Sequence, residues 1–120
     1  DIPNLDKLGY LSMGSSAITG GNLAGNPYIE YVLVNNLGWI EATVDALLES
    51  LYTNRAIYTR TGYGAEHTLN IGGTNATPSG IYQDDATPST GLEYAYKLVV
   101  DPDAEGYKKW NITWTGGSGS

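Results

Sequence analysis

The stretch 28–37 constrains the fold of this 120-residue chain more than any other. It begins with a short apolar run, typical of a buried strand, and ends in the amide pair Asn35-Asn36, where a chain can turn. A segment with helical periodicity follows directly. The stretch therefore predicts one unit of a repeating fold in which a short strand leads into a helix.

A second copy of this pattern lies twenty residues earlier in the chain. Apolar residues at positions 1, 4 and 6, followed by a small polar residue at position 9, fit the leucine-rich pattern L-x-x-L-x-L-x-x-N. Side chains alternate across a strand, so positions 4 and 6 are predicted to face the core. The two copies place at these positions Leu8, Leu11, Met13 and Ser16, then Tyr28, Tyr31, Leu33 and Asn36.

Two later segments match the pattern less closely. In 67–73, Leu69 and Ile71 are expected to point inward, and in 110–114, Ile112 and Trp114 are expected to do the same. Short alternating strands separated by helices favour right-handed crossovers between parallel neighbours. We therefore predict four parallel strands, at about 10–13, 30–34, 67–71 and 110–114.

Two segments are predicted to be helices. In 39–53, apolar residues recur at helical spacing and define one stripe. A second helix begins at Thr90, which forms a capping-box pattern with Glu93, and ends before Asp101-Pro102. The residues predicted to be buried are Ile40, Val44, Leu47, Leu48 and Leu51 in the first helix, and Leu92, Ala95, Tyr96 and Val99 in the second.

Composition narrows the domain organisation and the possible functions. The length suits one domain, predicted over 1–115, and the Gly/Ser-rich residues 116–120 read as a linker or tail. The chain has no Cys and one His, which excludes thiol chemistry and most zinc sites. A net charge of −7 disfavours nucleic acid, and no apolar run is long enough for membrane insertion.

No catalytic or cofactor motif stands out. His67 opens a predicted strand without a nucleophile elbow nearby, so a structural or solvated histidine is the better interpretation. The segment Gly62-Tyr63-Gly64 lacks the third glycine of a dinucleotide fingerprint. The adjacent acids Asp84 and Asp85 lie in a proline-rich loop and are expected to be solvated. We therefore expect a protein that is not an enzyme and uses no cofactor.

A weak calcium candidate lies near the C-terminus. Asp101, Asp103 and Glu105, followed by Gly106, copy the first half of a calcium-binding loop. The twelfth position should be a bidentate glutamate but is Ile112, so an acidic solvated turn is the favoured reading and no metal site is predicted.

The strand face opposite the core is the predicted binding surface. In parallel repeat folds, that face is open and often used for binding. The chain also has ten Tyr, three Trp and no Phe, which suits contacts with proteins or sugars and a surface shared in an oligomer. The residues predicted to lie on this face are Tyr10, Ser12, Glu30, Val32, Thr68, Asn70, Asn111 and Thr113.

Two runs carry a resemblance to a known class of proteins. Residues 36–48 and 69–79, the latter with a glycine-rich Asn-Ala-Thr-Pro-Ser exit, resemble leucine-rich-repeat-like modules of bacterial and phage surface proteins. The resemblance covers about 8–114 and is strongest over 28–79. It implies a small right-handed leucine-rich-repeat-like solenoid with about four parallel strands and two crossover helices.

The same resemblance implies a function. It favours a non-catalytic binding or adhesion module at a cell surface or on a virion, with a protein or glycan partner outside the cell. A structural assembly or decoration domain of a virion or fibre, without a ligand of its own, is the alternative. A carbohydrate-active accessory domain ranks below both.

Overall fold

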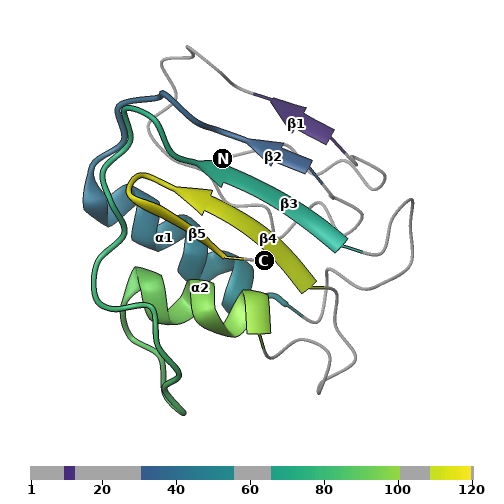
Figure 1. Cartoon of the computed structure of the whole chain (residues 1–120), viewed down its shortest axis with the longest axis vertical. Coiled ribbons are helices and arrows are strands. Elements are labelled where there is room, and N and C mark those ends of the chain that lie inside the picture. Colours follow the sequence, from purple (N-terminus) through teal and green to yellow (C-terminus); the bar gives the residue numbers. More distant parts are fainter. Residues whose placement is uncertain (1–9, 13–30, 56–65, 101–108, 120) are drawn as a thin grey trace.

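The computed structural model of this chain describes residues 10–12, 31–55, 66–100 and 109–119. These residues form a five-stranded sheet and two helices (Figure 1). In chain order the elements are β1 (Tyr10–Ser12), β2 (Tyr31–Leu33), α1 (Glu41–Thr53), β3 (Glu66–Ile71), α2 (Gly91–Val100), β4 (Lys109–Trp114) and β5 (Gly117–Gly119).

The strands lie side by side in sequence order. The first four pair in parallel, whereas β5 pairs with β4 in the antiparallel direction. Sequential parallel neighbours require a crossover between each pair, and α1 and α2 supply two of these crossovers. The predicted α/β fold, with four parallel strands and two helices, is therefore confirmed at this level.

The apolar stripe of α1 forms as predicted, with one exception. Val44, Leu47, Leu48 and Leu51 are buried, as expected for residues spaced by three and four along one helical face. Ile40 was expected in the same stripe but is 68% exposed. It occupies the N-cap position, where φ is −75° and ψ is 164°, so its extended backbone takes the side chain off the helical face.

The predicted capping box at the start of α2 is present, with a shifted partner. The Glu93 N–H donates to Thr90 Oγ1 at 3.4 Å, as the motif requires. The Glu93 carboxylate accepts from the Ser89 N–H at 3.0 Å, one residue before the usual partner. Leu92, Ala95, Leu98 and Val99 are buried, whereas Tyr96, expected to be buried, is half-buried.

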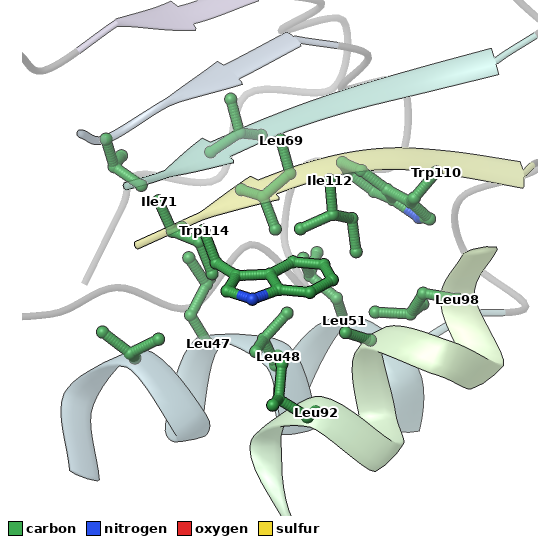
Figure 2. Close-up of a cluster of buried hydrophobic side chains, with 14 of the residues drawn as sticks. Leu47, Leu48, Leu51, Leu69, Ile71, Leu92, Leu98, Trp110, Ile112 and Trp114 are labelled. Atoms are coloured by element: carbon green, nitrogen blue, oxygen red, sulfur yellow. The ribbon is translucent and has the colours of Figure 1, made fainter. Parts of the chain in front are cut away.

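Both helices pack on one face of the sheet, and the core fills the space between them. Figure 2 shows Leu69, Ile71 and Ile112 pointing from the strands toward the helical leucines. Trp110 and Trp114 extend from β4 into the same layer, at 1% and 8% exposure. This one-sided packing leaves the opposite face of the sheet uncovered by either helix.

The inward residues in β2 and at Val34, which follows it, differ from the prediction by one position. Val32 and Val34 are 0% and 1% exposed, whereas Leu33 is half-buried. The expectation that Leu33 points into the core is therefore wrong. Val32 is in register with Leu69, which is in register with Ile112, and side chains that lie beside each other in a sheet share a face. The register of the longer strands thus sets the facing of β2.

The Gly/Ser segment predicted to be a linker contains a strand. Gly117 and Gly119 lie in β5, in register with Trp114 and Ile112. A Cβ at Gly117 would come 2.8 Å from the Trp114 indole nitrogen, and one at Gly119 would come 2.6 Å from the Tyr82 hydroxyl. These two glycines therefore allow close packing against the side chains of Trp114 and Tyr82.

Candidate binding face

Four uncharged polar side chains occupy the face of the sheet that the helices leave open. Thr68 on β3 is in register with Asn111 on β4, and Asn70 with Thr113. Thr113 is exposed, and the other three are half-buried. All four were predicted to lie on this face. Their flanking residues Leu69 and Ile112 are buried on the opposite side, as the alternation of a strand requires.

The two rows continue across the sheet through the backbone register. Tyr10 is in register with Tyr31, which pairs with Thr68, and Ser12 is in register with Leu33, which pairs with Asn70. Tyr10 and Ser12 were predicted at these positions, whereas Tyr31 and Leu33 were not. For Leu33, the burial of its neighbours Val32 and Val34 and its pairing with Asn70 assign it to the open side of the sheet.

Two predicted members of the face are not placed there. Val32 was expected on the open side but is fully buried in the core, because it pairs with Leu69. Its assignment to the binding face is wrong. Glu30 lies outside the described residues.

The amide of Asn70 is oriented by the chain that follows it. Its Oδ1 accepts a hydrogen bond from the Gly72 N–H at 3.0 Å. A side-chain oxygen that bonds to the backbone two residues later is a common device for turning the chain at the end of a strand. Asn70 therefore supports the exit of β3 and presents the remainder of its amide to the open face.

Asn75, whose importance the sequence analysis missed, holds together the segments that follow the C-terminal ends of β2 and β3. Its Oδ1 accepts from the N–H groups of Leu37 and Trp39, at 3.1 and 3.0 Å. Its Nδ2 donates to the carbonyls of Val34 and Ile71, at 2.8 and 3.1 Å. The side chain is 2% exposed, so these bonds satisfy a buried amide completely and join the exits of β2 and β3.

A carboxylate joins the two helices. Asp45 on α1 accepts from the Ser79 N–H at 3.0 Å and from the Ser79 hydroxyl at 2.5 Å. The Ser79 hydroxyl oxygen in turn accepts from the Gly91 N–H at 3.2 Å, at the first residue of α2. Asp45 and Ser79 thus position the start of α2 against α1.

His67, Asp84 and Asp85, which were considered as catalytic candidates, each contact other side chains or backbone groups of the fold. His67 is 1% exposed, with its ring centroid 4.2 Å from that of Trp110. Asp84 forms an ion pair with Lys97 at 2.7 Å, and Asp85 accepts from the Thr87 N–H at 2.9 Å. Asp84 is exposed in this ion pair, as expected of a solvated acid, and each of the two acids also has a local partner.

The weak calcium candidate lies in a part of the chain that the structure does not describe. The calcium candidates Asp101, Asp103 and Glu105 lie outside the described residues, as do Gly62, Tyr63 and Gly64. Within the described ranges, no group of three or more His, Cys, Asp or Glu side chains is arranged to hold a metal ion.

Comparisons with known protein families, with curated proteins and with solved structures found no match. Neither α1 nor α2, the two helices of the described ranges, has the length and apolar character needed to cross a membrane.

Proposed function

We propose that this chain is a non-catalytic binding module of a bacterial surface protein or phage appendage, and that it binds a neutral glycan on the open face of its sheet. The observation that carries the proposal is the paired arrangement of Thr68 with Asn111 and of Asn70 with Thr113. Threonine hydroxyls and asparagine amides both donate and accept hydrogen bonds, as sugar hydroxyls do. Their placement on paired strands fixes their spacing before a ligand arrives.

The charge of the chain supports a neutral ligand. The net charge of −7 disfavours phosphate, sulfate or carboxylate groups on a partner. The rows of β3 and β4 also include Lys109, two residues before Asn111, and its register partner Glu66, so the two charges in these rows cancel and leave no net charge to select an ionic ligand. Protein interfaces are enriched in aromatic residues and arginine at their centres, which the described part of β3 and β4 does not present here. A glycan is therefore favoured over a protein.

The proposal includes a right-handed leucine-rich-repeat-like solenoid as the architecture. Sequential parallel strands with both helices on one side support it, because stacked repeats place each strand beside the next. The Asn75 amide also supports it. Each repeat must turn away from the sheet, and the turn leaves backbone groups without ladder partners that a buried amide can bind.

Glycan binding by the isolated chain tests the proposal. Thr113→Lys places a long cationic side chain on the exposed part of the face, and we expect it to weaken binding at least about tenfold. Thr53→Lys is the matched control, because Thr53 is also exposed but lies on α1, on the helical side of the sheet. The control is expected to bind as the parent does.

Four outcomes would contradict this function. Glycan arrays without a neutral ligand, or equal binding by both variants, would remove the open face as a glycan site. Capture of a protein that Thr113→Lys abolishes and Thr53→Lys retains would assign the face to a protein partner. Hydrolysis of a sugar polymer would replace the binding module with an enzyme.

A further inference from the structure

The turn between β4 and β5 differs from the turns that suit a two-residue hairpin. Trp114 is in register with Gly117, so Thr115 and Gly116 form the loop. Favoured two-residue hairpins have a positive φ at the first loop residue, because this matches the twist of the strands. Here the second loop residue, Gly116, has a φ of 98°, whereas the φ of the first, Thr115, is not positive. The turn is therefore outside the favoured classes.

Thr115 is held in this conformation by the neighbouring strand exit. Its hydroxyl lies 3.1 Å from the carbonyl oxygen of Gly73 and 2.7 Å from that of Asn75, either of which can accept its proton. Its own carbonyl accepts from the Thr77 hydroxyl at 2.9 Å. These contacts fix Thr115 to the turn after β3, so Gly116 is the pivot about which β5 departs from β4.

β5 itself is weakly anchored. It pairs over three residues, Gly117, Ser118 and Gly119, of which only the exposed Ser118 has a side chain. Its attachment rests on backbone pairing and on glycine backbone packed against Trp114 and Tyr82. Elements with few side-chain contacts open locally at low free energy. Departure of β5 would expose the edge of β4 at Ile112 and Trp114, which are 1% and 8% exposed.

The slot beside β4 accepts only a restricted kind of strand. A residue with a Cβ at the position of Gly117 or Gly119 meets the Trp114 indole or the Tyr82 hydroxyl. The Gly-Ser-Gly segment of a second copy of this chain meets neither. Exchange of an identical element between copies makes the same contacts in both states and is a low-cost route to a dimer.

We propose that β5 exchanges between two copies of this chain, so that each β5 pairs with the β4 of its partner in a symmetric dimer. Gly116 changes from its turn conformation to an extended one, and Thr115 stays docked on its own β3 exit. The exchange joins two open sheet faces in one particle. It does not depend on what those faces bind.

Cross-linking between two differently marked chains tests this exchange. The chain has no cysteine, and Thr113 and Ser118 are exposed register partners on β4 and β5. A Thr113→Cys chain and a Ser118→Cys chain are unfolded together, refolded at high concentration and oxidised. We expect a disulfide-linked heterodimer joined through positions 113 and 118, identified by non-reducing gel and peptide mass spectrometry.

An exposed position away from β5 supplies the control. Ala86 is also exposed, in the connection between β3 and α2, so Ala86→Cys replaces Ser118→Cys in a parallel mixture. Heterodimer yields that are equal in the two mixtures would overturn the proposal.

Two further variants test the pivot and the slot. Gly116→Val in both chains disfavours the positive φ without a close steric contact, since a Cβ there meets only Thr77 Oγ1 at 3.8 Å. It is expected to raise the heterodimer yield about tenfold. Gly117→Val in the chain with Ser118→Cys blocks the slot and is expected to abolish the product. A yield unchanged by both variants would also overturn the exchange.

Discussion

Trp39 and Asn75 are joined through a buried hydrogen bond in which the Trp39 N–H donates to the Asn75 Oδ1 at 3.0 Å. The carbonyl of Trp39 accepts from the next backbone N–H, that of Ala76, at 2.8 Å. The segment after β2 is thereby held against the segment after β3. The Asn75 side chain thus joins the two turns by hydrogen bonds, as backbone hydrogen bonds join the strands of the sheet.

Replacement of Asn75 should destabilise the whole domain. Asn75→Ala removes the partners of two backbone N–H groups and two carbonyls in the interior, and we expect a loss of at least about 3 kcal/mol in the free energy of unfolding. Urea denaturation measures this loss. Asn35→Ala, at a half-buried position in the turn after β2, is the control and is expected to change stability by less than about 0.5 kcal/mol. Similar losses for both would show that the amide does not join the turns.

The glycines of β5 should be sensitive to a single methyl group. Gly117→Ala places a Cβ against the Trp114 indole and is expected to weaken the pairing of β5 with β4. Because β5 opens locally at low free energy, the free energy of unfolding should fall by no more than about 1 kcal/mol. Ser118→Ala changes an exposed residue of the same strand and is expected to have little effect. Thermal unfolding distinguishes the two. A flexible linker would tolerate both substitutions equally.

Glu93 should make stability depend on pH in the acidic range. The hydrogen bond from the Ser89 N–H is the main cause that lowers the pKa of this carboxyl, and it outweighs the burial that raises the pKa. A lowered folded-state pKa gives a stabilising contribution above the unfolded pKa, about 4.3, which is lost as pH falls through the folded value. Denaturant midpoints of the parent and of Glu93→Gln should therefore differ near neutral pH and converge in acid. A constant difference would contradict this account.

Leu51 and Ile40 were both predicted to be buried on one face of α1, but only Leu51 is buried in the structure. Leu51→Ala removes a side chain that is 0% exposed and should destabilise the domain by about 2–5 kcal/mol. Ile40→Ala, at the exposed N-cap, should change the free energy of unfolding by less than about 0.5 kcal/mol. Chemical denaturation measures both. A large loss in the free energy of unfolding for Ile40→Ala would indicate that Ile40 is buried in the core and would contradict this account.

The carboxyl half of the chain was easier to predict than the amino half, as β3 and β2 illustrate. In β3, Leu69 and Ile71 alternate with polar Thr68 and Asn70, so one facing alone buries apolar groups. In β2 and the residue after it, Tyr31, Val32, Leu33 and Val34 are all apolar or aromatic, and either facing is locally acceptable. The pattern therefore identified four members of the open face on β3 and β4 and placed Val32 on the wrong side.

The sequence by itself determined the elements whose signal is local. Apolar residues spaced by three and four specify α1, and Thr90 with Glu93 specifies the start of α2, because helical hydrogen bonds and caps join near neighbours in the chain. Only the tertiary structure decided the facing of β2 and the fate of the Gly/Ser segment. Both depend on packing between elements that are distant in sequence, since pairing with Leu69 on β3 buries Val32, and the side chain of Tyr82 requires glycine at position 119 of β5.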